Sequence, residues 1–200
     1  MRGLRTAAGL VLASALIAVP IAWFLLPEPP PLPSLYPMPA FSLTSEQGRP
    51  FGAADVQGKV VVANFIFTSC PTVCPLLTAH MAKIQERFAA EDRVHLLSFS
   101  VDPKNDTPAK LQGFAAQYRQ DPARWTFLTG ELAAVETAIE KGFKIHMDGA
   151  GDPEATAFDI VHGEHFVLVD AKGTIRGYYQ PSHEELERLA GDVERLLAEP

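Results

Sequence analysis

Two cysteines, Cys70 and Cys74, are the residues of this 200-residue chain that are best placed to do chemistry. They stand four positions apart in the segment FTSCPTVCP, which follows an apolar run. If the residues between them begin a helical turn, both sulfur atoms emerge on one side of it. The N-terminus of a helix also lowers the pKa of a thiol, which makes the thiol a better nucleophile and a better metal ligand. The spacing therefore favours a redox couple or a clamp for a soft metal ion.

Two other uses of this cysteine pair have weaker support. A structural disulfide between Cys70 and Cys74 would close a very short loop and would therefore add little stability. The letters CPT also occur at the reactive cysteine of peroxidases, but no matching pair of arginine and threonine is identified in the sequence. The redox couple and the metal clamp remain the main hypotheses.

A metal clamp needs a third ligand, and an imidazole beside two thiolates suits copper or zinc. Four of the six histidines are expected to pack within the fold or to lack a partner, namely His80, His95, His146 and His183. His162 and His165 remain, in the segment DIVHGEHFVLVD. In a regular strand these two side chains face opposite sides, so at most one of them should reach the cysteines. His162 lies nearer to the preceding loop and to the open edge of the expected sheet.

Strands and helices alternate after Ala40. The expected strands cover residues 59–68, 93–101, 125–128, 165–170 and 174–179. The expected helices cover residues 75–90, 132–143 and 184–197, the last capped by Ser182, and another helix begins at Thr107 with Pro108 in its first turn. Right-handed crossovers would join them into a three-layer α/β domain with a largely parallel sheet. The cysteines then lie at the carboxyl end of a strand, where such folds bind ligands.

The N-terminal region predicts a membrane anchor. Residues 7–26 are twenty in number and carry no charge, and as a helix they would be about 30 Å long, roughly the thickness of a hydrocarbon core. Arg2 and Arg5 precede this run, so the positive-inside rule leaves the N-terminus in the cytoplasm and the rest of the chain across the membrane. A cleaved signal peptide is the alternative.

A proline-rich segment, PEPPPLPSLYPMP, follows at residues 27–39. Its many prolines predict a polyproline II spacer in which no helix or strand ladder forms, about 40 Å long. We therefore expect three parts: residues 1–26 as cytoplasmic N-terminus and membrane anchor, 27–39 as linker, and 40–200 as a single folded domain.

Composition excludes several classes of function. Two cysteines are too few for a disulfide-rich miniprotein or a four-thiolate zinc site. The formal net charge of -7 disfavours binding to the phosphate backbone of nucleic acids, because that binding needs a basic surface. Asp102 and Asp106 are expected to shape the rim of the site or to cap the next helix rather than to bind metal.

Three motifs carry a resemblance to a known family. TSCPTVCP, SVDPKNDTP and HGEHFVLVDAKG resemble the corresponding segments of the Sco/SenC family of thioredoxin-like copper proteins. The resemblance implies a thioredoxin-like three-layer sandwich with a central mixed sheet. It also implies a copper ion, Cu(I) or Cu(II), held by Cys70, Cys74 and His162.

The same resemblance implies a membrane-tethered copper metallochaperone rather than an enzyme. It would deliver copper to the dinuclear copper centre of cytochrome c oxidase, with the copper-bearing subunit of the oxidase as partner and other copper chaperones or thiol reductants as further partners. The expected location is the cell inner membrane, single-pass, with the domain on the periplasmic side.

The alternative is a thiol-disulfide oxidoreductase that reduces the cysteines of the acceptor subunit through Cys70 and Cys74. This chain also departs from the family pattern, because Val161 and Gly163 flank His162 where the family often has an acidic and a small hydroxyl residue. Asp159 is the residue that we expect to supply a carboxylate to the histidine instead.

Overall fold

A computed structural model describes residues 30–149 and 159–199 and shows a mixed sheet of eight strands. The strands lie in the order β1-β10-β9-β4-β5-β6-β2-β3. Their bounds are β1 Tyr36–Pro37, β2 Ser42–Ser45, β3 Pro50–Gly52, β4 Val60–Ile66, β5 Val94–Ser100, β6 Trp125–Thr129, β9 Phe166–Val169 and β10 Thr174–Tyr179. A separate two-stranded sheet pairs β7, Met147–Asp148, with β8, Val161–His162.

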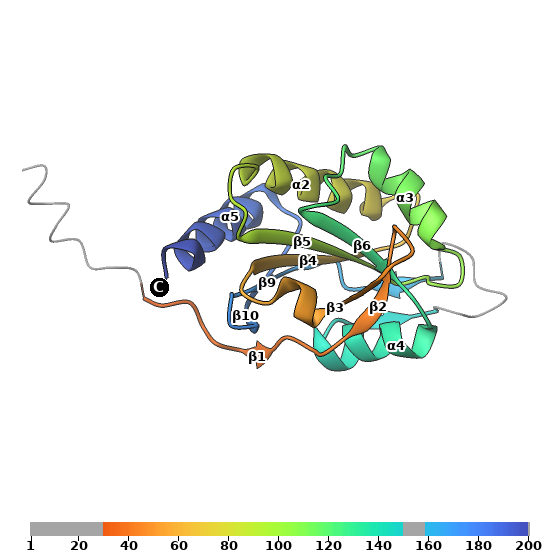
Figure 1. Ribbon diagram of the computed structural model, residues 1–200, viewed down its shortest axis with the longest axis horizontal. Coiled ribbons are helices and arrows are strands. Elements are labelled where there is room, and N and C mark those ends of the chain that lie inside the picture. Colours follow the sequence, from red (N-terminus) through yellow and green to blue (C-terminus); the bar gives the residue numbers. More distant parts are fainter. Residues whose placement is uncertain (1–29, 150–158, 200) are drawn as a thin grey trace, which may run out of the picture. The chain divides into compact units, whose positions relative to one another are not determined.

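Helices cover both faces of the large sheet, as expected for a three-layer α/β domain. Figure 1 shows α2, α3 and α5 on one side and α4 on the other. The helical segments are η1 Ala53–Val56, α2 Val73–Arg87, α3 Pro108–Ala116, α4 Leu132–Glu136, the π-helix η2 Thr137–Gly142 and α5 His183–Ala198. β4, β5 and β6 are parallel and lie side by side in chain order. Two successive right-handed crossovers therefore place α2 and α3 on the same face of the sheet.

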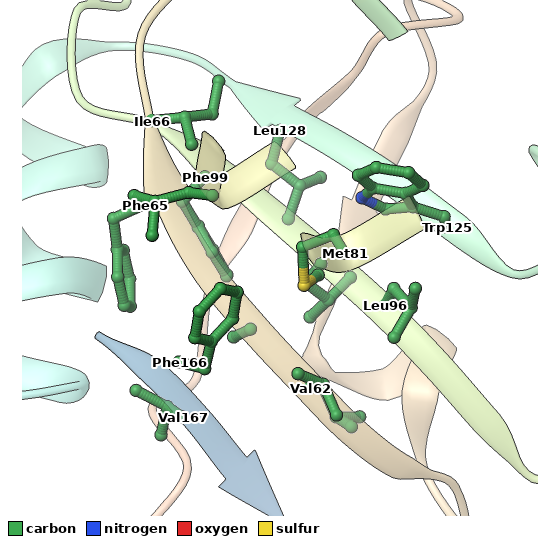
Figure 2. Close-up of a cluster of buried hydrophobic side chains, with 14 of the residues drawn as sticks. Val62, Phe65, Ile66, Met81, Leu96, Phe99, Trp125, Leu128, Phe166 and Val167 are labelled. Atoms are coloured by element: carbon green, nitrogen blue, oxygen red, sulfur yellow. The ribbon is translucent and has the colours of Figure 1, made fainter. Parts of the chain in front are cut away.

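The core lies around the two central strands. Every residue of β4 and of β5 is buried, which explains why apolar residues occupy consecutive positions in both strands instead of every second one. Figure 2 shows the side chains of Val62 and Phe65 from β4 with Leu96 and Phe99 from β5, and with Met81 from α2. This rigid centre fixes the position of the segment that follows β4, which carries the two cysteines.

The expected helix caps are present in the structure. The hydroxyl of Thr107 accepts a hydrogen bond from the backbone N–H of Lys110, and that of Ser182 accepts one from the N–H of Glu185. One expected helix differs, because residues 132–143 form α4 followed by the π-helix η2 rather than one regular helix. A period-3.6 pattern does not reveal a local widening of the helix.

The expectation of a largely parallel sheet is wrong. Only the β4–β5 and β5–β6 pairs of the large sheet are parallel, whereas the remaining pairs of neighbours are antiparallel. The β9–β10 hairpin and the β2–β3 hairpin add antiparallel strands on the two sides of the central three. The sheet is mixed, as the family resemblance implied.

The expectation that residues 27–39 form no strand ladder is also wrong. Tyr36 and Pro37 pair with β10 as β1, the edge strand of the sheet. The backbone N–H groups of Leu35 and Met38 donate to carbonyl groups of β10 and of the preceding turn, at 2.9 and 2.7 Å. Prolines are tolerated here because an edge strand needs only some of its N–H groups for pairing. We call residues 32–39 the N-terminal strap.

Arg176 of β10 holds the beginning of the strap. Its side chain is buried, and it donates hydrogen bonds to the carbonyl oxygens of Leu32 and Pro33, each at 2.7 Å. The same guanidinium forms an ion pair with Asp170 at 2.9 Å.

No helix within residues 30–149 and 159–199 is both long and apolar enough to cross a membrane, and the expected span at residues 7–26 lies outside the described residues.

Candidate metal centre

The two cysteines lie where β4 gives way to α2. The chain leaves β4 at Ile66, and α2 begins at Val73, so Cys70 lies in the connecting loop and Cys74 in the first turn of the helix. The helix begins two residues before Pro75, which we had expected to open it. Both cysteines are free thiols, and Cys74 is completely buried while Cys70 is 8% exposed. The loop therefore presents Cys70 outward and keeps Cys74 beneath it.

The two thiols differ in acidity. Burial opposes the ionisation of Cys70, but hydrogen bonds from the backbone N–H groups of Cys74 and Thr72 outweigh burial and lower its pKa. Burial raises the pKa of Cys74 far above the usual value for a thiol, and the neighbouring Cys70 and Asp106 raise it further. Cys70 is therefore the more readily deprotonated of the two thiols, and Cys74 keeps its proton more firmly.

His162 of β8 meets the cysteines from a distant part of the chain. Its Nε2 atom lies 3.6 Å from Sγ of Cys74, across 88 positions of sequence. Its Nδ1 atom lies 3.3 Å from the carbonyl oxygen of Gly163, which leaves Nε2 free of the proton when Nδ1 donates. The partner of Nδ1 is thus a backbone carbonyl, where we had expected the carboxylate of Asp159.

The imidazole of His162 is neutral near pH 7. Burial is the main cause that lowers its pKa, and the Gly163 carbonyl and the charge of Glu164 oppose this effect only in part. The ring also packs edge-on against Phe67, with the ring centroids 5.8 Å apart. A neutral imidazole in a fixed orientation is the form that binds metals.

The site opens to solvent through a small cleft of about 230 Å³. Residues from the cysteine loop and from the segment around β8 line it: Phe67, Cys70, Pro71, Thr72, Val73, Ile160, Val161, His162 and Glu164. Cys70 and His162 face this cleft, whereas Cys74 does not. A ligand or partner that enters the cleft therefore reaches Cys70 and His162 before Cys74.

The other histidines lie apart from this centre. Nε2 of His165 lies 2.8 Å from Nε2 of Gln180, and the ring packs against Tyr178, so this histidine does not join the cysteines. His95 is buried and lies 3.0 Å from the hydroxyl of Thr126, in agreement with its expected packing. Of these two histidines, His162 is the one that lies beside a cysteine.

A buried carboxylate supports the cysteine loop from below. Asp106 is completely buried and accepts hydrogen bonds from the backbone N–H of Thr68 at 3.1 Å and from the hydroxyl of Ser100 at 2.7 Å. The hydroxyl of Thr68 also donates to it. Burial raises the pKa of Asp106, and these hydrogen bonds oppose that effect. Asp106 therefore anchors the residue two positions before Cys70.

Of the two roles expected for Asp106, capping of the next helix is wrong, because the cap is Thr107. The available sequence signal was the position of Asp106 after a strand adjacent to the cysteine-bearing strand, since the ends of parallel neighbours meet at one edge of a sheet. Nothing in the sequence marks Thr68 or Ser100 as its partners.

The donor set fits a soft metal ion. Two thiols and a neutral imidazole suit Cu(I), and they accept Cu(II) when a further ligand is added. Within the described residues, no three His, Cys, Asp or Glu side chains are already arranged as a metal site. Binding at Cys70, Cys74 and His162 would therefore require small side-chain movements together with loss of the Cys74 proton.

The fold and this dithiol–imidazole centre define a thioredoxin-like α/β protein of the Sco type. The family model described as SCO1/SenC matches residues 34–198, and the chain belongs to this family. The SCO1 protein homolog of Bacillus subtilis (strain 168) is 37% identical over 145 residues, which make up 72% of this chain and 73% of that protein.

Solved structures show the same fold. A SCO1/SenC family lipoprotein from Bacillus anthracis str. Ames has a TM-score of 0.72 and 34% identity, covering 81% of this chain and 95% of that one. The protein BsSco, described as a cytochrome c oxidase assembly protein with a disulfide switch, has a TM-score of 0.70 and 32% identity, covering 82% and 95%. Copper is bound in the structure of ScoI from Bradyrhizobium japonicum, which is 23% identical with a TM-score of 0.64 and covers 81% of this chain and 99% of that one.

Proposed function

We propose that this chain is a copper metallochaperone that binds copper through Cys70, Cys74 and His162 and delivers it to the dinuclear copper centre of cytochrome c oxidase. The observation that carries the proposal is the 3.6 Å approach of His162 Nε2 to Cys74 Sγ beside Cys70. Soft and borderline donors are thus close to one another, and two of them, Cys70 and His162, line a solvent-accessible cleft. Membership of the SCO1/SenC family and the copper-binding relatives support the same conclusion.

The site suits transfer rather than permanent storage of copper. Ligand exchange needs an under-coordinated ion that an acceptor can approach, and the cleft gives access to Cys70 and His162 from outside. The copper-bearing subunit of the oxidase is the proposed acceptor. Val161 on the rim of the cleft is 54% exposed and offers an apolar contact to such a protein. Other copper chaperones and thiol reductants are proposed as the proteins that load and reduce the site.

The proposed topology is that of a single-pass protein of the cell inner membrane. Residues 1–26 would provide the cytoplasmic N-terminus and the anchor, and 40–200 a copper-binding domain on the periplasmic side. Residues 27–39 would be the linker, of which the strap, residues 32–39, lies against the sheet. The uncharged run at residues 7–26 behind Arg2 and Arg5 supports this orientation. Fusion of a reporter that is active only outside the cytoplasm to the C-terminus tests it, and an inactive reporter would contradict it.

Copper titration of the purified, reduced full chain tests the main proposal. We expect one copper ion per chain and, with Cu(II), visible absorption from thiolate-to-copper charge transfer. His162→Ala should weaken binding by at least about tenfold, because even groups that only support a ligand have effects of that size. The matched control is His165→Ala, since His165 lies on the same segment but faces Gln180. Equal affinity of the His162 variant and the unsubstituted chain would refute the ligand assignment.

A thiol-disulfide oxidoreductase is the second candidate, favoured by the contrast between the acidic Cys70 and the protonated Cys74. The Cys70 thiolate would attack a disulfide of the acceptor, form a mixed disulfide and release one acceptor thiolate. Cys74 would then lose its proton, attack Cys70 and release the second acceptor thiolate, so that the acceptor is reduced and the Cys70–Cys74 pair is oxidised. Such an enzyme should keep most of its reductase turnover in His162→Ala, whereas a metallochaperone loses tight copper binding.

A further inference from the structure

Met147 lies directly across the small β7–β8 sheet from His162. The two residues are register partners in this antiparallel pair, and Asp148 and Val161 form the other pair. Residues that are directly opposite in an antiparallel pair have their side chains on the same face, with Cβ atoms about 4.5 to 5.5 Å apart. Met147 and His162 therefore share one face of the small sheet.

Burial identifies that face as the inner one. Met147 is 6% exposed and His162 is half-buried, whereas Asp148 is exposed and Val161 is 54% exposed. The imidazole of His162 extends from the inner face to Cys74. The thioether of Met147 consequently belongs to the same side of the sheet as the proposed copper site.

The register of this pair is held from both strands. The backbone N–H of Met147 donates to the carboxylate of Glu140 at 3.3 Å, and the N–H of Gly163 donates to the carbonyl of His146 at 3.0 Å. Glu140 belongs to the π-helix η2, so the β7 strand is attached to the helical layer. Sliding by one residue would turn Met147 outward and would break both contacts.

Methionine has the chemistry that the donor set lacks. Its thioether is a soft ligand that suits Cu(I), and it carries no charge and no proton to be lost on binding. Rotation about the side-chain bonds of this flexible residue allows the sulfur atom to move several ångströms while the backbone stays fixed. From this placement we propose that Met147 provides a further, thioether ligand to the copper ion held by Cys70, Cys74 and His162, and that it favours Cu(I) over Cu(II).

This inference rests on the proposed function, and two measurements on the full chain test it. The first is the dissociation constant for Cu(I), measured by competition with a Cu(I)-specific chelator. Met147→Leu keeps the apolar volume and should weaken Cu(I) binding by about tenfold or more, with a smaller effect on Cu(II). Met81→Leu is the matched control, because Met81 is also buried but lies two helical turns beyond Cys74 on α2.

The second measurement looks for the thioether ligand directly in the unsubstituted chain. In chain labelled with selenomethionine and loaded with Cu(I), selenium X-ray absorption should show a copper neighbour at bonding distance, and this signal should vanish in labelled Met147→Leu. An unchanged Cu(I) constant in Met147→Leu, with no copper neighbour around selenium, overturns the inference while copper binding by the unsubstituted chain leaves the proposed function intact. Failure of the unsubstituted chain to bind copper overturns both.

Discussion

The support that Asp106 gives to the cysteine loop leads to a quantitative prediction. Asp106→Ala leaves three donors without their acceptor, namely the N–H and hydroxyl of Thr68 and the hydroxyl of Ser100. Each unsatisfied buried donor costs about 1 to 3 kcal/mol, and rotation of the two hydroxyls recovers part of that sum. We expect the free energy of unfolding to fall by about 4 kcal/mol. Asp106→Asn should lose only about 1 kcal/mol, because its amide oxygen can still accept from the Thr68 N–H.

Urea unfolding measures the stability of both variants, and chelator competition measures their copper affinity. We expect Asp106→Ala to bind copper about 10- to 100-fold more weakly, because the loop that carries Cys70 loses its anchor. Asp192→Ala is the matched control, since Asp192 is also buried and accepts a hydrogen bond from Tyr179, but it lies on α5. The control should lose stability and keep its copper affinity. Full copper affinity in a folded Asp106→Ala chain would refute the supporting role, and full stability would refute the hydrogen-bond argument.

Three further predictions follow from buried groups. Burial lowers the pKa of His95 to about 4 in the folded protein, from a value near 6.5 in the unfolded chain. The contribution of the neutral ring to the free energy of unfolding is therefore fully present above pH 6.5, and about 3 kcal/mol of it is lost as the pH falls to 4. Unfolding free energies measured from pH 7 to 4 should therefore decline less steeply in His95→Gln, and parallel curves would contradict this. In reduced chain at pH 7, iodoacetamide should modify Cys70 well before Cys74, as followed by mass spectrometry of the peptides, and equal rates would contradict the assigned acidities. Arg176→Met leaves the buried Asp170 without its ion-pair partner and should cost about 3 kcal/mol, with faster proteolysis of the strap, whereas the exposed Arg188→Met should do neither.

The central part of the fold could be predicted because its signals are local. The apolar runs that became β4 and β5 and the caps at Thr107 and Ser182 each follow from a few adjacent residues. Strands of two to four residues outside the predicted hairpin carry no comparable pattern, so β1, β2, β3, β7 and β8 were missed. Their existence depends on partners that are distant in sequence, which a periodicity cannot reveal.

The site could be predicted in part for the same reason. The C-x-x-x-C spacing placed both sulfur atoms together, and the family resemblance supplied His162. Spacing alone did not distinguish the roles of the two thiols, because the difference in their pKa values comes from burial and from backbone N–H groups of the folded loop. The anchoring by Asp106 and the pairing of Met147 with His162 arise only when separate strands meet.

Docking of the strap against β10 changes the geometry of the proposed attachment to the membrane. With residues 32–39 bound to the sheet, at most five residues, 27–31, remain to span the distance between the proposed anchor and the domain. At about 3.1 Å per residue this tether extends about 15 Å, well under half of the distance that the whole proline-rich segment would allow. The domain would then stay within a thin layer next to the bilayer. It could not reach an acceptor whose copper-receiving loop lies farther from the membrane.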